Sequence, residues 1–201
     1  LVENGFLYIA QPPLYKVSRG KSEVYLKDQA EMEDYLIQQG IDGALLRLED
    51  GAELAGQDLA RVVDEARQLK CVLDAFPNHY PQHILEQAAI AGAFVPGRVD
   101  ADLQGTADRI AARLDLIAAE YERGWNGRIT QDHGIRLARI LRGVEEVRRL
   151  DGPMLRSGEA LKTGSFTESL QEIYGSAATL IRKDRSQLIF GPLALLDSVL
   201  K

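Results

Sequence analysis

The sequence has little of what secreted and membrane proteins depend on. It contains a single cysteine, Cys71, so no internal disulfide can form, which is typical of proteins in a reducing cytosol. No apolar run approaches the roughly 20 residues that a membrane-spanning helix needs, and no signal peptide opens the chain. We therefore expect a cytoplasmic protein without a membrane contact. The first residue is Leu1 rather than Met, which favours a piece of a longer chain.

The composition excludes disordered and fibrous classes, because 45% of the 201 residues are hydrophobic and 27% are charged. This length is enough for one compact domain, or for a small unit with an appendage. Asp and Glu number 30 against 24 Lys and Arg, which gives a net charge of −6. A chain this acidic does not bind nucleic acid over its whole surface, so any such contact must be local.

The first quarter of the chain predicts short strands and one helix. Two β-favouring runs at residues 14–17 and 24–26 flank a turn in which Gly20 supplies a positive φ, so we expect a β-hairpin. Asp28 is a favourable N-cap for a helix that ends at Gly40. Further strands are expected at residues 6–10 and 44–48.

Two long helices are predicted in the middle of the chain. Apolar residues recur at three- and four-residue steps over residues 59–76 and 103–121, which places them on one face of each helix. We expect the two apolar faces to pack against each other as an antiparallel pair. A short helix between them begins near Pro81, a residue that favours the first turn.

The last third of the chain is less clear, because residues 127–142 fit two structures. The turn residues Asp132-His133-Gly134 favour a hairpin, but Leu137, Ile140, Leu141, Val144 and Val147 also fit a helical face, so both remain open. Beyond this segment we expect a helix over 166–174, a second hairpin of strands 178–182 and 187–190, and a last helix that begins at Pro192.

The residues alone indicate no catalytic, cofactor or metal site. Gly20-Lys21-Ser22 ends like a phosphate-binding loop, but Tyr15 stands where that loop needs an earlier glycine, and a strand follows instead of a helix. A zinc site needs four converging ligands, or three and a water. His79 and His83 supply only two, and the third histidine, His133, lies far away in the sequence. The sequence also has no Gly-x-Ser-x-Gly motif around a nucleophilic serine.

Two stretches are locally basic. Residues 13–27 carry four cations against one carboxylate, and residues 134–150 carry five arginines against two glutamates. Such clusters can hold nucleic-acid phosphates without reading sequence, although solubilising surface charge explains them equally well. We interpret Tyr121 and Trp125 as core or junction residues rather than platforms for stacked bases. The candidate DNA contacts are Lys16, Arg19, Lys21, Arg136, Arg139 and Arg142.

The opening Gly5-Phe6-Leu7-Tyr8-Ile9-Ala10-Gln11-Pro12-Pro13-Leu14-Tyr15-Lys16-Val17 resembles a stretch of the DNA gyrase B-protein family. In that family this stretch lies near the end of the first part of the metal-binding Toprim domain. The continuation from Gly20 through Asp28 is similar to the family's hairpin. Segments within residues 54–62 and 80–85 are similar to the front of a large insertion that many Gram-negative gyrases carry.

The resemblance implies an α+β fold in two parts. On this basis we expect residues 1–39 to be the C-terminal edge of the Toprim segment, with its hairpin and short helix, and residues 40–201 to be an insertion domain with a long helical pair and antiparallel hairpins. The parent enzyme that the resemblance implies is an ATP-dependent type II DNA topoisomerase that introduces negative supercoils and uses Mg²⁺ and ATP. The expected partners are the rest of the gyrase B protein, the gyrase A protein and double-stranded DNA.

In the family, the ATP-binding domain, the Mg²⁺-binding carboxylates and the nucleophilic tyrosine all lie outside the part that this chain resembles. The resemblance therefore implies an architectural and DNA-contacting role, and an isolated fragment that is inactive. Among the candidate DNA contacts, it places only Lys16 near DNA.

Two other identities remain open. The B-type protein of topoisomerase IV shares the Gln-Pro-Pro-Leu-Tyr-Lys stretch, although an insertion of this size favours gyrase. A free-standing interaction module without an enzymatic parent predicts a reading frame that starts near Leu1, and the missing initiator methionine argues against it.

Overall fold

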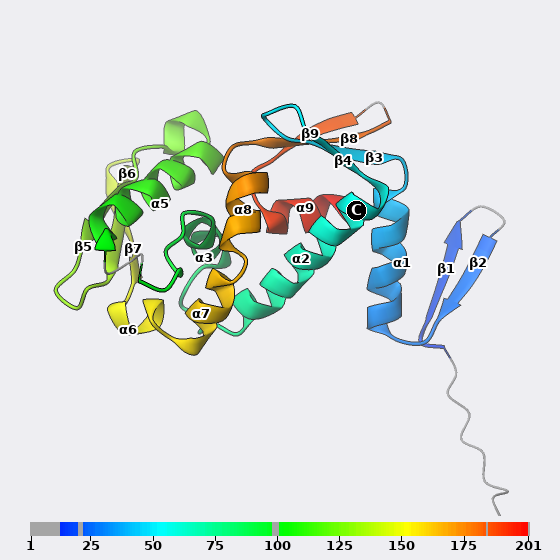
Figure 1. Cartoon of the computed structure of the whole chain (residues 1–201), viewed down its shortest axis with the longest axis horizontal. Coiled ribbons are helices and arrows are strands. Elements are labelled where there is room, and N and C mark those ends of the chain that lie inside the picture. Colours follow the sequence, from blue (N-terminus) through cyan, green and yellow to red (C-terminus); the bar gives the residue numbers. More distant parts are fainter. Residues whose placement is uncertain (1–12, 20–21, 98–100, 184, 201) are drawn as a thin grey trace, which may run out of the picture.

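The computed structural model describes residues 13–19, 22–97, 101–183 and 185–200, and it combines helices with antiparallel strands as expected of an α+β protein (Figure 1). The strand expected at residues 6–10 and the turn residue Gly20 lie outside the described residues. The strands are β1 (Tyr15–Arg19), β2 (Ser22–Leu26), β3 (Ala44–Arg47), β4 (Glu53–Ala55), β5 (Asn126–Ile129), β6 (Ile135–Leu141), β7 (Val144–Leu150), β8 (Ala178–Arg182) and β9 (Arg185–Ile189). The helices are α1 (Gln29–Ile41), α2 (Gly56–Asp74), α3 (Gln82–Ile90), α5 (Leu103–Ile117), the 3-10 helix η1 (Glu120–Glu122), α6 (Gly152–Leu155), α7 (Gly158–Gly164), α8 (Thr167–Tyr174) and α9 (Pro192–Val199).

Strands β1 and β2 form the expected N-terminal hairpin, which stands beside α1 (Figure 1). Val17 lies opposite Val24, and Tyr15 lies opposite Leu26. Because alternate residues of a strand share a face, these four side chains form one apolar face of the hairpin. Leu26 is buried, but the other three are only half-buried, so the hairpin keeps an apolar surface that this chain covers incompletely.

Helix α1 begins where the sequence predicts and ends later. The carboxylate of Asp28 accepts a hydrogen bond from the amide of Glu31 at 2.9 Å and caps the first turn. Gly40 does not end the helix, so that expectation is wrong; the left-handed turn follows at Gly43, with a φ of 66°. Gly40 is instead required by packing, because a Cβ there would overlap the carbonyl oxygen of Val199 in α9.

A four-stranded antiparallel sheet joins segments from opposite ends of the sequence. Its strand order is β4-β3-β8-β9, with Leu46 of β3 opposite Leu180 of β8. Both strands and the β8–β9 hairpin are expected from the sequence, but the pairing of β3 with β8 is not. The buried side chains of this sheet pack toward α2 and α9, which lie side by side beneath it (Figure 1).

The segment that fitted both a hairpin and a helix is a hairpin, and it gains a third strand. The sheet order is β5-β6-β7. Ile135 and Leu137 are fully buried, so burial in β6 starts with the two-residue period of a strand. Helix α5 packs against this sheet so closely that a Cβ on Gly127 in β5 would overlap the carbonyl of Ala107.

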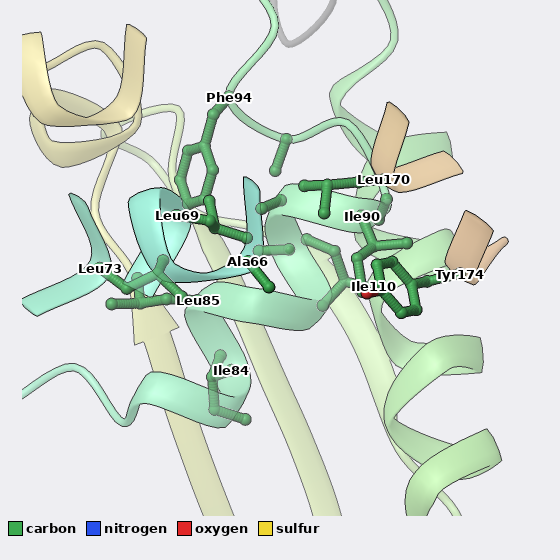
Figure 2. Close-up of a cluster of buried hydrophobic side chains, with 14 of the residues drawn as sticks. Ala66, Leu69, Leu73, Ile84, Leu85, Ile90, Phe94, Ile110, Leu170 and Tyr174 are labelled. Atoms are coloured by element: carbon green, nitrogen blue, oxygen red, sulfur yellow. The ribbon is translucent and has the colours of Figure 1, made fainter. Parts of the chain in front are cut away.

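The two long helices do not form the expected direct pair. Helix α3 lies between α2 and α5 and contacts both (Figure 1). Helix α5 ends at Ile117, whereas the sequence predicts that this helix continues to Gly124. Figure 2 shows the core that these helices share with α8. None of the helices within the described residues is long and apolar enough to cross a bilayer. The labelled core side chains are Ala66, Leu69, Leu73, Ile84, Leu85, Ile90, Phe94, Ile110, Leu170 and Tyr174.

A buried polar network ties the helices to the second half of the chain. The guanidinium of Arg113 in α5 donates hydrogen bonds to Oε1 of Gln87 at 2.8 Å and to the carbonyls of Gly175 and Phe190 at 2.9 Å each. Beside it, Oε1 of Glu86 accepts the amide hydrogen bond of Leu193 at 2.8 Å, in the first turn of α9. Burying a charged group is costly unless it is hydrogen-bonded, and the side chains of Arg113 and Glu86 each have hydrogen-bond partners.

We predict that Gly40→Ala destabilises the fold by about 1–3 kcal/mol, because the added methyl group forces α1 away from α9. Denaturant unfolding followed by circular dichroism measures the loss. Gly158→Ala is the matched control: its Cβ meets no atom within 4 Å at the start of α7, so stability stays equal or rises slightly. Equal stabilities of Gly40→Ala and the wild type would contradict the close contact.

Candidate nucleic-acid interface

The first basic cluster lies on the β1–β2 hairpin. Nζ of Lys16 is 2.8 Å from a carboxylate oxygen of Glu23 and 5.6 Å from the ring centre of Tyr25, on the face opposite the apolar one. The side chain of Arg19 and all of Lys21 lie outside the described part of the chain. The Lys16 side chain is thus half-exposed and can reach a phosphate, although it already forms an ion pair with Glu23.

The second basic cluster is divided between the two faces of the β5-β6-β7 sheet. Because side chains alternate, Leu137 and Arg139 point to the inner face that α5 covers, whereas Arg136 and Ile140 point to the outer face. Arg128, Arg136 and Arg149 are neighbours in register across the three strands, so they form one row of arginines on the outer face. Arg128 is not among the candidate DNA contacts expected from the sequence. It joins this row only through the pairing of β5 with β6, which the sequence alone does not establish.

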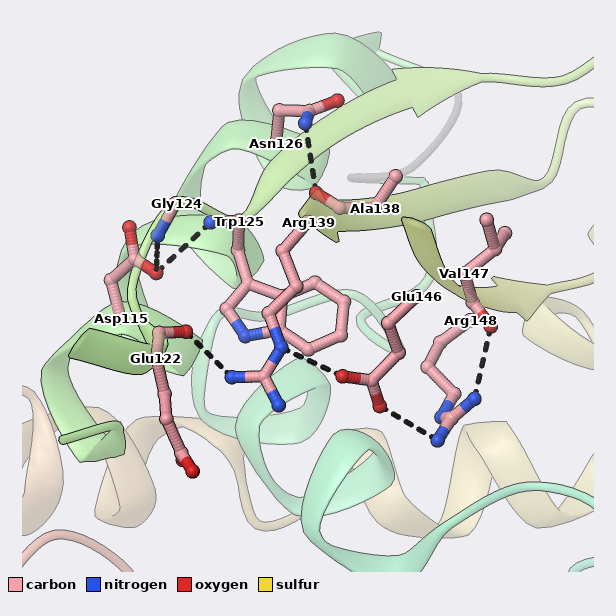
Figure 3. A network of polar contacts seen from close by, with 10 residues as sticks. All are labelled: Asp115, Glu122, Gly124, Trp125, Asn126, Ala138, Arg139, Glu146, Val147 and Arg148. Atoms are coloured by element: carbon pink, nitrogen blue, oxygen red, sulfur yellow. Dashed lines mark hydrogen bonds and ion pairs between the residues drawn. The ribbon is translucent and has the colours of Figure 1, made fainter. Parts of the chain in front are cut away.

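Arg139 is part of a structural network on the inner face (Figure 3). Its guanidinium bonds to Glu146 at 2.7 Å and to the carbonyl of Glu122 at 2.6 Å, and it lies 4.7 Å from the ring centre of Trp125. Glu146 also pairs with Arg148 at 2.7 Å. The Arg139 side chain is only 13% exposed, so these contacts hold η1 and Trp125 against the sheet and leave little of it for a ligand.

The remaining arginines of this cluster differ in how far they are already paired. Arg136 bonds to Glu145 at 2.8 Å across the strands, and Arg149 pairs with Asp132 and Asp151 at 2.8 Å each. Arg142 is exposed at the turn between β6 and β7 and has no ion pair with another described residue. Among the three arginines predicted from this cluster, Arg142 is therefore the one best placed to meet a phosphate.

Asp132 organises the turn between β5 and β6. Its carboxylate accepts hydrogen bonds from the Thr130 hydroxyl at 2.6 Å and from the amide of Gly152 at 3.2 Å, and it pairs with Arg149. These contacts hold the pKa of Asp132 well below its usual range, the Thr130 hydroxyl contributing most. His133 follows it with a φ of 56°, so the predicted turn is confirmed by a left-handed residue.

The aromatic residues near the sheet behave differently from each other. Trp125 is buried, as predicted from the sequence, and its amide and that of Gly124 both donate to the carboxylate of Asp115. Tyr121 is 73% exposed, so it is not a core residue; its place in η1, between α5 and β5, agrees with the alternative of a junction residue. It lies in η1, which the Arg139–Glu122 bond holds beside the sheet.

The histidines do not converge on a common site. His79 lines a cavity of about 360 Å³ with Tyr80 and Arg149, whereas His83 lines one of about 150 Å³ with Trp125 and Arg139. Burial, with help from Arg148, lowers the pKa of His83, which favours the neutral ring. Within the described ranges, no group of three or more His, Cys, Asp or Glu side chains is arranged to hold a metal ion.

We predict that Arg139→Ala and Arg142→Ala separate folding from phosphate contact. Arg139→Ala lowers the free energy of unfolding by about 1.5–3 kcal/mol, because charge-assisted hydrogen bonds and the contact with Trp125 are lost. Arg142→Ala leaves stability unchanged but reduces the slope of log affinity for duplex DNA against log salt by about one. Chemical unfolding and fluorescence anisotropy at several salt concentrations measure the two effects. An unchanged slope for Arg142→Ala would mean that this arginine is ordinary surface charge.

We also predict that the protein loses stability at alkaline pH because the Tyr80 hydroxyl loses its proton. Its hydroxyl donates to Asp151 at 2.8 Å, and burial together with this hydrogen bond raises the pKa of Tyr80 to about 12. The pKa of Tyr80 in the folded protein is above its unfolded value near 10. The stability that Tyr80 contributes is therefore fully present below pH 10, and it is lost between pH 10 and 12 by at most about 1.4 kcal/mol per pH unit. The measurement is the stability difference between wild type and Tyr80→Phe at each pH; a difference independent of pH would refute the linkage.

Comparison with known proteins covers the whole chain. A family model described as "GyrB, hook" matches residues 13–41, which are β1, β2 and α1. The DNA gyrase B protein of Caulobacter vibrioides is 40% identical over 203 residues, covering 100% of this chain and 24% of the relative. The corresponding gyrase protein of Rickettsia conorii is 30% identical over 210 residues, covering 100% of this chain and 25% of the relative.

The B protein of a type 2 topoisomerase from Aquifex aeolicus is 41% identical over 63 residues, 31% of this chain and 8% of the relative. The chain spans about a quarter of the length of the gyrase proteins that it matches. The resemblance inferred from the opening residues is thus confirmed along the full sequence: the chain is homologous to a segment of the DNA gyrase B protein.

Proposed function

We propose that this chain is a segment of the B protein of a DNA gyrase, an ATP-dependent type II topoisomerase that introduces negative supercoils, and that the segment has an architectural and DNA-contacting role. The observation that carries the proposal is the 40% identity to a gyrase B protein over 100% of the chain. The rest of the gyrase B protein, the gyrase A protein and double-stranded DNA are its proposed partners.

The β1–β2 hairpin supports attachment to another part of the enzyme. A two-stranded hairpin is marginally stable by itself, and it needs further strands or a helix against its apolar face. Here Tyr15, Val17 and Val24 remain half-exposed on that face. We therefore assign residues 1–39 to the edge of the Toprim domain, where this hairpin completes a larger hydrophobic layer.

The contact between Gly40 and Val199 supports the assignment of residues 40–201 to an inserted domain. The backbones of α1 and α9 meet at these two residues, so the chain leaves α1 and returns to the same place after about 160 residues. Domains whose ends lie close together can be inserted into another domain without disturbing it. The buried Arg113 network and the shared core give this part its own stability.

The DNA-contacting role is assigned to Lys16, Arg19 and Lys21 on the hairpin and to the β5-β6-β7 sheet. Of the three sheet candidates, Arg142 is the most accessible, while Arg136 and Arg139 also stabilise the sheet. We assign the Mg²⁺ and ATP sites of the parent enzyme to parts of the gyrase B protein that this chain does not resemble. The proposed role of this segment is therefore architectural and DNA-contacting rather than catalytic.

The B-type protein of a topoisomerase IV is the second candidate. The relatives reported above that match the whole chain are gyrase B proteins. The whole-length matches include the segment that we assign to the insertion, which favours gyrase over topoisomerase IV and over a free-standing module.

The test is a deletion in the full enzyme that replaces residues 42–198 with a short Gly/Ser linker. The contact between Gly40 and Val199 means that such a linker spans the gap without strain. We expect affinity for duplex DNA to fall at least about tenfold, which corresponds to about 1.4 kcal/mol, and stimulation of the ATPase by DNA to fall with it. The ATPase rate without DNA is the control for folding. Unchanged DNA affinity together with unchanged stimulation would remove the proposed role.

A further inference from the structure

We propose that the tip of the β6–β7 hairpin, residues 140–144, is a wedge that enters the minor groove of DNA. Arg142 lies in the groove, and the apolar side chains of Ile140 and Val144 press against the base edges beside it. The inference rests on the proposed DNA-contacting function and names the element that makes the contact.

The tip exposes apolar side chains on both of its faces. Ile140 is 71% exposed and Val144 is 69% exposed. In the register of the hairpin, Leu141 lies opposite Val144 and Ile140 lies opposite Glu145, so Ile140 and Val144 point to opposite faces. A hairpin that lies flat on a partner needs apolar side chains on one face only. A hairpin that inserts into a groove contacts both walls of the groove, so it needs apolar side chains on both faces.

The turn places a cation at the outermost point of the hairpin. Arg142 and Gly143 have φ values of 53° and 80°, so both central residues of this two-residue turn are left-handed. Such turns favour Asn or Gly, and an arginine there accepts some strain. Its side chain has no hydrogen bond or ion pair with another described residue, so it is available to an anionic partner.

The hairpin behind the tip is braced on both faces. Arg139 pairs with Glu146 on the inner face and Arg136 with Glu145 on the outer face, at 2.7 and 2.8 Å. Arg139 also binds the carbonyl of Glu122, which fixes the hairpin to η1 (Figure 3). A wedge that is held in place before binding loses less conformational entropy when it inserts.

The charge of the segment that carries the tip favours DNA over an apolar pocket in a protein. Residues 121–149 contain seven arginines, no lysine and four carboxylates, in a chain with a net charge of −6. Arg123, Arg128 and Arg142 are the exposed arginines of this region without an ion pair in the described structure. A narrow minor groove attracts arginine, and apolar residues inserted between base steps are the usual wedge of minor-groove proteins.

The test uses the assembled enzyme carrying Ile140→Ser with Val144→Ser, or Arg142→Gln. We expect the double variant to bind linear duplex about tenfold more weakly with an unchanged salt slope, because it removes apolar contacts only. Arg142→Gln reduces the salt slope by about one. Leu188→Ser is the matched control: Leu188 is 57% exposed on β9 of the other sheet, and its replacement leaves both quantities unchanged. All of these positions are exposed, so thermal unfolding remains that of the wild type.

Duplexes with inosine in place of guanine identify the groove, because inosine lacks the amino group that guanine presents in the minor groove only. We expect the wild type to bind these duplexes more tightly and the double variant to gain nothing.

Unchanged DNA binding by both variants, with the deletion of residues 42–198 still harmful, would overturn the wedge and leave the proposed function intact. If the double variant weakens assembly of the enzyme but not DNA binding, the tip binds protein and the wedge is wrong. A deletion without effect overturns both.

Discussion

The buried guanidinium of Arg113 is the interaction on which the larger part of this molecule depends. It lies where α3, α5, the end of α8 and the turn into α9 meet, and each of its three hydrogen bonds goes to a different one of its neighbours. Burial lowers the pKa of Arg113 and raises that of Glu86 beside it, because both charges are costly away from water. That cost is offset only while every partner is in place, so these elements dock together or not at all.

The same principle explains how the arginines of the β5-β6-β7 sheet are divided. Those that meet a carboxylate across the strands, such as Arg136 and Arg139, are used to hold the sheet and η1. Arg142 stands at a turn where no cross-strand carboxylate of the described residues pairs with it, so its charge faces the solvent. A basic cluster in the sequence therefore overstates the positive surface that a nucleic acid meets, because charge paired inside the fold no longer attracts a distant phosphate.

The relation between the two parts of the chain follows from backbone packing. Gly40 allows α1 to touch α9, so the chain returns to the end of α1 after about 160 residues, as the proposed inserted domain requires. The hairpin before it keeps a half-exposed apolar face, which suits attachment to a neighbouring sheet. In the proposed enzyme, an inserted domain held in this way would present the β6–β7 hairpin to DNA while the N-terminal hairpin stays packed on its neighbouring sheet.

Local signals in the sequence were enough to determine most helices and strands: the cap at Asp28, the start of α3 after Pro81, and the β8–β9 hairpin follow from turn and capping chemistry within a few residues. For residues 127–142 these signals left a hairpin and a helix both open, and the β5–β6 pairing decided for the hairpin. The sequence also identified the candidate DNA-contacting lysines and arginines, but it did not show which of them are paired with carboxylates in the fold. Only the tertiary structure decided that β3 pairs with β8, that α3 separates α2 from α5, and that Gly40 serves packing rather than termination. The reason is physical: capping and periodicity act between residues a few positions apart, whereas strand order, helix contacts and ion pairing depend on surfaces that meet only after the chain has folded.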